Sequence, residues 1–194
     1  VSLHESAVAK EICKHPLEVS SKSEVDLGVL LSAFNLKVIT EKQKREFTVE
    51  TAFQSSKKFS QGGPYTDLLY VTSIAAKKDS RLQNSGYLVA FEFFGQEWSL
   101  EPKTAFYDWL YINALRKNEW AIEQLSHYDA FTDIEFNPQK SINCQAYSVA
   151  LFKALLGRGL LKEAVESKEH FLAIAGGGPV HNARENTAIQ PNLI

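Results

Sequence analysis

Residues 103–118, KTAFYDWLYINALRKN, form the most strongly helical stretch of the sequence. Aromatic and aliphatic side chains occur on almost every side of such a helix, so little of it can face water. We therefore expect this helix to lie at the centre of the core. Its carboxylate, Asp108, lies between Tyr107 and Trp109. That side chain is either at an exposed edge of the helix or desolvated in a functional site.

The rest of the sequence predicts further helices and a few short strands. Ser2 and Glu5 have the spacing of a capping box, and Thr48 is a suitable N-cap. The expected helices are 2–14, 48–59, 66–80, 119–127, 142–157 and 160–173. One strand is expected to begin after Pro16 and is followed by a turn at Gly28, and a second strand is expected at 35–41. Residues 87–100 are expected to form a hairpin with Gly95 in its turn, and a further strand is expected within 127–138. The predicted fold class is mainly α with a few short strands (α+β).

The length of 194 residues suits a single domain. We place this domain at 1–174, with a helical N-terminal extension at 1–17. Residues 175–194 lose helical periodicity and gather Gly, Asn and Pro, which is typical of an irregular tail. The chain begins at Val1 and contains no Met, so we expect it to be an internal piece of a longer protein.

Composition narrows the class of function. Lys plus Arg number 21 and Asp plus Glu number 23, which gives a formal net charge of −2. Proteins that bind nucleic acid backbones non-specifically show a basic excess, so a DNA substrate would have to be recognised by a specific chemical feature. We expect Cys13 and Cys144 to be free thiols in a cytoplasmic protein, because no signal peptide or membrane span is recognisable. The histidines show no metal spacing, and we assign no metal and no cofactor.

Glu50, Gln54 and Lys57 are spaced i, i+4 and i+7 in the predicted helix 48–59, so they share one face. Such a stripe is often the solvated side of an amphipathic helix. The alternative is a functional site, because the turn GGPYTD at 62–67 follows directly and glycines let the backbone approach a ligand closely.

Two further segments carry polar groups. In DAFTDIEFNPQKSINCQA, residues 129–146, a strand would place Asp133 and Glu135 on one face, with Asn137 following. These residues are either ordinary turn formers or a set that recognises a ribose or a base edge. The loop VSSKS, 19–23, contains Ser21 and Lys22 and is a weak candidate for binding phosphate.

Several of these segments resemble the NADAR (YbiA-like) family. Glu50, Phe53, Gln54 and Lys57 fall on the family's Glu-aromatic-Phe-Gln-x-x-Lys helix, although Lys58 replaces a usually apolar residue. The segment GVLLSAFN (28–35) resembles the family's glycine-then-LSNF segment, with Ala33 in place of Asn. SIAAKKDSRL (73–82) resembles its Ala-Lys stretch, and residues 103–115 resemble its Asp-containing helix. DAFTDIEFNP resembles the family segment in which Glu135 and Asn137 fall on a glutamate and an asparagine. These matches cover about 18–155 and imply a YbiA-like single-domain helical fold.

The combination of motifs is most similar to NADAR proteins paired with DarT toxins. Those toxins attach ADP-ribose to guanine in DNA, and the resemblance implies an antitoxin that hydrolyses this N-glycosidic bond. The implied partners are the ADP-ribose moiety, ADP-ribosylated DNA and a DarT-type toxin, with no membrane. Two alternatives remain: an N-glycosidase for small phosphoribosyl-amine metabolites, and a non-catalytic module that binds ADP-ribose or the toxin.

The resemblance and the residue patterns together give the expected site. The candidate catalytic residues are Glu50, Lys57 and Asp108. The candidate substrate-binding residues are Ser21, Lys22, Ser32, Phe34, Phe53, Gln54, Gly63, Tyr65, Trp109, Glu135 and Asn137. A carboxylate would stabilise the cation-like transition state, or an unprotonated Lys57 would attack the anomeric carbon and form a Schiff base.

Overall fold

A computed structural model describes residues 2–40, 44–137, 141 and 143–175 of the chain. The helices are α1 Leu3–Ala9, α2 Asp26–Leu30, α3 Val49–Ser55, η1 Thr66–Tyr70 (a 3-10 helix), α4 Ser73–Lys77, α5 Arg81–Asn84, α6 Ala105–Leu115, α7 Glu119–Leu125, α8 Gln145–Gly157, α9 Leu161–Ala164 and α10 Lys168–Ala175. The strands are β1 Pro16–Glu18, β2 Lys37–Ile39, β3 Glu46–Thr48, β4 Lys57–Phe59, β5 Leu88–Phe93, β6 Gln96–Trp98 and β7 Ala130–Thr132. The predicted α+β class with few short strands is confirmed.

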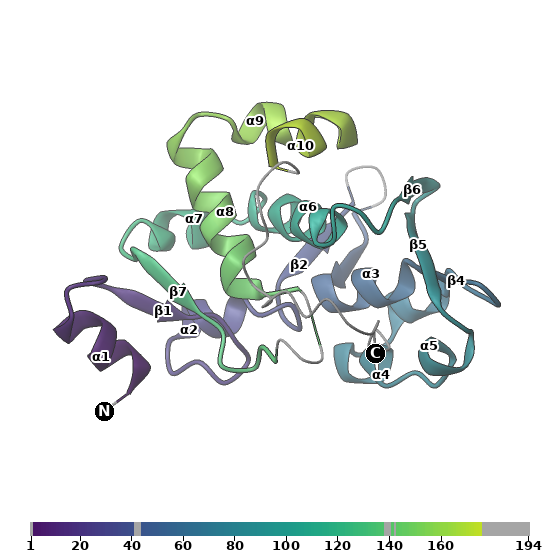
Figure 1. The fold of residues 1–194 in the computed structure, drawn as a ribbon, viewed down its shortest axis with the longest axis horizontal. Helices are drawn as coiled ribbons and strands as arrows, with labels where there is room; N and C mark the ends of the chain where they lie inside the picture. The colour runs from purple at the N-terminus through teal and green to yellow at the C-terminus, as the bar shows by residue number, and fades with distance from the viewer. Residues whose placement is uncertain (1, 41–43, 138–140, 142, 176–194) are drawn as a thin grey trace.

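Helix α6 lies at the centre of the molecule (Figure 1), as its composition predicts. Nearly every residue from Ala105 to Leu115 is buried, and the helix contacts α3, α8, α10 and β2. A helix without a polar face needs partners on all sides, and these four elements supply them. The buried Tyr111 hydroxyl donates a hydrogen bond to the carbonyl of Leu31, which ties α6 to the residues that follow α2.

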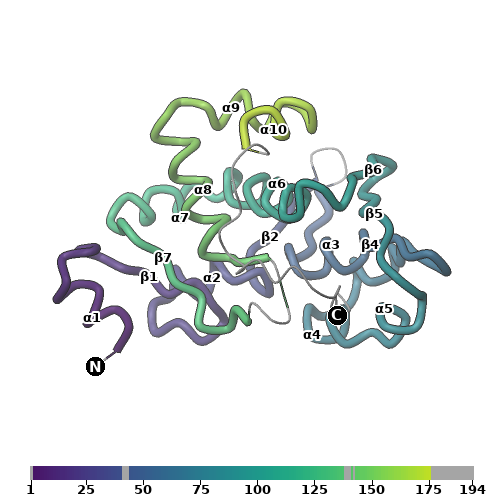
Figure 2. The backbone as a smooth tube through the Cα atoms, viewed as in Figure 1, coloured from purple at the N-terminus to yellow at the C-terminus, as the bar shows by residue number. Residues whose placement is uncertain are grey.

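The strands form three small sheets around this helical centre. β1 pairs with β7 in parallel, so the start of the chain lies beside a segment from its last third (Figure 2). β2 pairs with β3 in a second sheet. The third sheet is antiparallel, contains β4, β5 and β6, and lies at the end of the molecule opposite to the β1–β7 pair (Figure 1). The predicted hairpin is confirmed as β5–β6, with Gly95 at φ +80° in its turn.

The predicted helix 48–59 is wrong in its second half. α3 ends at Ser55, because the hydroxyls of Ser55 and Ser56 both donate to the carbonyl of Ala52, at 3.0 and 2.6 Å, and compete with continued helical pairing. The chain then enters β4, where Lys57 pairs with Phe91 of β5. Lys57 therefore lies on a strand and not on the helix.

Other predicted boundaries also shift. The segment 66–80 is not one helix, because Thr72 is extended and caps α4 by accepting from the Ala75 N–H at 3.2 Å. The segment 160–173 divides into α9 and α10 where the Ser167 hydroxyl accepts from the His170 N–H at 3.1 Å. The helix 2–14 stops at Ala9, although its capping box with Ser2 and Glu5 is confirmed.

The expected turn at Gly28 is wrong, because Gly28 lies within helix α2. A Cβ at Gly28 would lie 2.0 Å from the carbonyl oxygen of Glu18, so glycine is needed for α2 to pack against β1.

The predicted strand through Asp133 and Glu135 is also wrong, because β7 ends at Thr132. The carboxylate of Glu18 accepts the N–H of Ile134 at 2.8 Å and turns the chain away. Residues 176–194 of the predicted tail lie outside the described residues.

Candidate active site

Helix α3 carries polar residues into the core. Its N-cap, Thr48, forms a capping box with Thr51, and the Thr48 hydroxyl also lies 2.8 Å from the hydroxyl of Ser73 at the start of α4. Every residue of α3 is buried. Glu50 and Gln54 are each 6% exposed, so the interpretation of this face as a solvated stripe is wrong.

Lys57 is 5% exposed although it lies on β4. Its Nζ lies 5.1 Å from the centroid of the Phe53 ring, and the charge of Glu50 acts on it. Burial lowers the pKa of Lys57 to about 8, against the opposing effect of Glu50 and with a smaller lowering effect of Lys77. The structure thus brings Glu50, Phe53, Gln54 and Lys57 together.

Two buried polar atoms, one on Gln54 and one on Ser32, lack a hydrogen-bond partner among the described residues. The Gln54 Nε2 donates to Glu50 Oε1 at 2.9 Å, which leaves Gln54 Oε1 without a donor. The hydroxyl of Ser32, which is 1% exposed, is likewise without a partner. An unsatisfied buried polar group costs roughly 1–3 kcal/mol, so atoms of this kind are suited to bind a ligand.

The loop 32–35 is fixed against α3 and α4 through its backbone. The N–H of Glu50 donates to the carbonyl of Ala33 at 2.9 Å, and the Ser73 hydroxyl donates to the carbonyl of Phe34 at 3.0 Å. The N–H of Ala33 donates to Oε1 of Gln145, at the start of α8. Ser32 and the half-buried Phe34, which flank Ala33, therefore belong to a loop held against the start of α3 by backbone bonds.

Asp108 is 3% exposed, so the alternative of an exposed helix edge is wrong. The Ser148 hydroxyl of α8 donates to Asp108 Oδ1 at 2.6 Å. Burial raises the pKa of Asp108 to about 6, while hydrogen bonds from Ser148 and Thr104 act in the opposite direction. The side chain thus joins α6 to α8. It is Tyr107, one residue earlier, that packs edge-on against Phe53 with ring centroids 5.2 Å apart.

Glu135 binds the loop 20–23 through hydrogen bonds and an ion pair. The backbone N–H and the hydroxyl of Ser21 donate to Glu135 Oε2 at 3.1 and 2.9 Å, and Lys22 Nζ lies 3.8 Å from Oε1. These side chains are largely exposed. Gln145 connects this cluster to the loop 32–35, because its Nε2 donates at 3.1 Å to Asp133, which also accepts the N–H of Glu135.

Three of the remaining candidates lie in other surroundings. Gly63, at φ +78°, has no room for a Cβ, which would lie 2.4 Å from the carbonyl oxygen of Lys57, so this turn packs on the strand that carries Lys57. Trp109 packs on Trp98 at 5.1 Å, and its indole N–H, like that of Trp98, lacks a partner among the described residues. Asn137 is exposed, and its carbonyl accepts from the Ser141 N–H at 2.9 Å.

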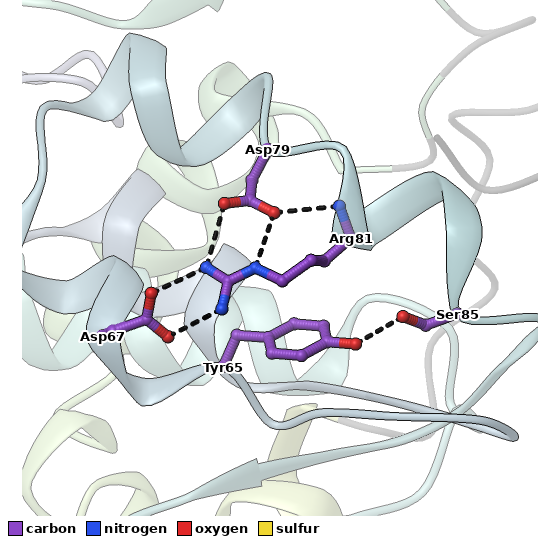
Figure 3. A network of polar contacts seen from close by, with 5 residues as sticks. All are labelled: Tyr65, Asp67, Asp79, Arg81 and Ser85. Atoms are coloured by element: carbon purple, nitrogen blue, oxygen red, sulfur yellow. Dashed lines mark hydrogen bonds and ion pairs between the residues drawn. The ribbon is translucent and has the colours of Figure 1, made fainter.

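Tyr65 is part of a polar network on the surface (Figure 3). Its hydroxyl bonds to that of Ser85, and the Arg81 guanidinium lies 4.5 Å from its ring centroid. Arg81 also binds Asp67 and Asp79, with N–O distances of 2.6 and 2.9 Å. These contacts join η1 to the α4–α5 turn, so Tyr65 stabilises the elements next to β4.

Comparison with known families identifies the chain. A family model of DarT1-associated NADAR antitoxins matches residues 1–185. The chain belongs to this family. Its family role is that of an antitoxin associated with DarT1, in agreement with the resemblance in the motifs. A comparison with curated proteins finds no match.

The described residues of this NADAR antitoxin contain no group of three or more His, Cys, Asp or Glu side chains able to hold a metal ion. Within the same ranges, no helix is both long and apolar enough to cross a membrane.

Sequence reasoning missed several residues around the Lys57 cluster of this antitoxin. Ser73 bonds to the loop 32–35 and Tyr107 packs on Phe53, while Ser148 bonds to Asp108. These contacts join elements far apart in sequence, for which no local pattern exists. Lys77 lies in the Ala-Lys stretch that supports the resemblance, and that stretch was the available signal.

Proposed function

We propose that this antitoxin removes ADP-ribose from guanine in DNA by hydrolysing the N-glycosidic bond, and so reverses the modification made by its DarT-type partner toxin. One observation carries the proposal: a buried lysine with its pKa lowered to about 8 lies within electrostatic reach of Glu50, whose hydrogen-bond partner Gln54 has an unpartnered Oε1. A lowered pKa of this kind increases the share of Lys57 present near neutral pH as the neutral amine, which is the nucleophilic form.

In the proposed reaction, the Lys57 Nζ lone pair attacks the anomeric carbon of ADP-ribose. The bond from that carbon to the guanine nitrogen breaks, and the departing nitrogen takes up a proton. The sugar ring opens to give a Schiff base on Lys57, and water adds to it and releases ADP-ribose and the free amine. A direct attack by water is the alternative, and a trapping experiment separates the two.

Glu50 supports the proposal through its position. It is buried, its Oε1 is held at 2.9 Å by Gln54 Nε2, and its charge is felt at Lys57. A carboxylate fixed there would stabilise positive charge that develops at the anomeric carbon. The free Gln54 Oε1 and the Ser32 hydroxyl would accept from and donate to the sugar hydroxyls.

The test uses a DNA oligonucleotide that carries ADP-ribosylated guanine. We expect release of ADP-ribose by the wild type and by Lys58→Ala, and a loss of at least a hundredfold in Lys57→Ala and Glu50→Gln. Lys58 is a matched control because it is the adjacent lysine but pairs with Glu97 at 2.8 Å on the outer side of the sheet.

Borohydride added during turnover should reduce the Schiff base and leave an ADP-ribose adduct on Lys57. Turnover without an adduct would exclude the covalent route and favour direct hydrolysis. No release by a folded wild type, with release from a phosphoribosyl-amine instead, would refute the DNA substrate. Binding of ADP-ribose without turnover of either compound would refute enzymatic activity.

A further inference from the structure

Lys77 is the last residue of α4 and lies over the loop 32–35. Its Nζ is 5.1 Å from the centroid of the Phe34 ring. Lys77 is exposed, and no carboxylate of the described residues pairs with it. The exposed Lys77 ammonium also acts electrostatically on the buried Lys57, so it lies over the loop 32–35 within electrostatic reach of Lys57.

Several other basic side chains of this part of the molecule are already engaged in ion pairs with carboxylates. Arg81 binds Asp67 and Asp79, and Lys58 binds Glu92 and Glu97. Lys22, expected from the sequence as a phosphate ligand, pairs with Glu135. Lys77, in contrast, has no carboxylate partner among the described residues, and its positive charge contributes to lowering the pKa of Lys57. Two ammonium groups that repel each other across a site favour an anion between or beside them.

We propose that Lys77 binds the diphosphate of ADP-ribose and so sets the position of the ligand relative to Lys57. This inference rests on the proposed function. In ADP-ribose the diphosphate is attached to the same ribose whose anomeric carbon reacts, at the opposite end of the sugar. If that carbon lies against buried Lys57, the diphosphate extends toward the solvent side, where Lys77 stands over Phe34.

The chain supplies a matched control for this assignment. Lys78 is the next residue, is exposed and carries the same charge, but it is not positioned over the Phe34 ring. Lys77→Ala and Lys78→Ala change the net charge equally, so a difference between them reports the position of the charge. Lys77→Arg retains the charge and should retain binding.

The experiment combines calorimetric binding of free ADP-ribose with steady-state turnover of the ADP-ribosylated oligonucleotide. We expect Lys77→Ala to weaken ADP-ribose binding and raise KM by roughly three- to fivefold, near the upper end for an exposed charge pair, with a smaller change in kcat. Lys78→Ala should stay within about twofold of wild type. The defect of Lys77→Ala should shrink at high salt, because screening weakens the wild-type contact. Ribose without phosphate should bind both variants equally.

Two results would overturn the inference while leaving the proposed function intact. In one, wild type releases ADP-ribose and Lys77→Ala behaves like Lys78→Ala. In the other, Lys77→Ala raises KM for the oligonucleotide but binds free ADP-ribose normally, which would assign Lys77 to a phosphate of the DNA backbone. If wild type neither binds ADP-ribose nor releases it from the oligonucleotide, both the inference and the proposed function are refuted.

Discussion

Replacement of Asp108 by Asn should make the protein more stable at neutral pH. Asp108 is buried on α6, and its pKa is raised to about 6 because burial disfavours the carboxylate. The folded protein therefore holds the proton more tightly than the unfolded chain, whose carboxyl has its ordinary value of 3.8. Stability from this group is complete below pH 3.8 and is lost as the pH rises through about 6.

The difference between the two pKa values sets the size of this effect. A gap of about 2 pKa units corresponds to about 3 kcal/mol once the pH is well above 6. Asn has nearly the same shape and its Oδ1 can still accept from Ser148, but it carries no charge that must be buried. For a protein of this length, about 3 kcal/mol corresponds to a rise in Tm of roughly 6–12 °C.

Thermal unfolding of wild type and Asp108→Asn at pH 4 and pH 7.5 measures this effect. The gain in Tm should be small at pH 4 and large at pH 7.5, and using two pH values cancels any constant difference between Asp and Asn. Asp129 is the opposite control: hydrogen bonds from the N–H groups of His15 and Lys14 lower its pKa, so Asp129→Asn should lose stability at neutral pH. An equal Tm difference for Asp108→Asn at both pH values would refute a buried, ionising Asp108.

Three further predictions concern the site. Ser32→Ala should leave Tm unchanged or slightly raised and weaken ADP-ribose binding about tenfold, because the hydroxyl has no partner among the described residues; a clear drop in Tm would contradict this. Gly63→Ala should lower the free energy of unfolding by about 1–3 kcal/mol more than Gly95→Ala in denaturant titration. Both glycines have positive φ, but only at Gly63 would a Cβ meet backbone, 2.4 Å from the Lys57 oxygen. Turnover by the covalent route should increase with pH toward a plateau above about pH 8 as Lys57 loses its proton, and a rate that falls between pH 6 and 8 would argue against a neutral-amine nucleophile.

The central helix and the grouping of Glu50, Phe53, Gln54 and Lys57 could be predicted from the sequence, whereas the geometry of this group could not. The apolar composition of 105–115 leaves α6 no position except the core, and Thr48 marks the start of α3. The end of α3 depends on the hydroxyls of Ser55 and Ser56 turning back to Ala52, a local competition that apolar periodicity does not reveal. Whether Glu50 and Gln54 face water or the core depends on what packs around α3, and that is a property of the whole fold.

The strand position of Lys57 makes the candidate site more rigid than a single helical face would be. Glu50 is fixed by α3, whose N–H groups and capping box are bound to the loop 32–35 and to α4. Lys57 is fixed separately by its pairing with Phe91 and by Gly63 packed on its carbonyl. The two side chains thus meet from two elements, and the short Ser55–Ser56 turn sets their separation.

That arrangement has a chemical consequence, because burial and Glu50 act on Lys57 in opposite directions. Burial alone would favour the neutral amine, while a carboxylate in direct contact would hold the proton on the lysine. No ion pair joins Glu50 and Lys57 in the described part of the chain, so desolvation dominates and the pKa falls to about 8. In the proposed reaction, Glu50 would lie near the place where a cation develops, without holding a proton on the amine that serves as the nucleophile.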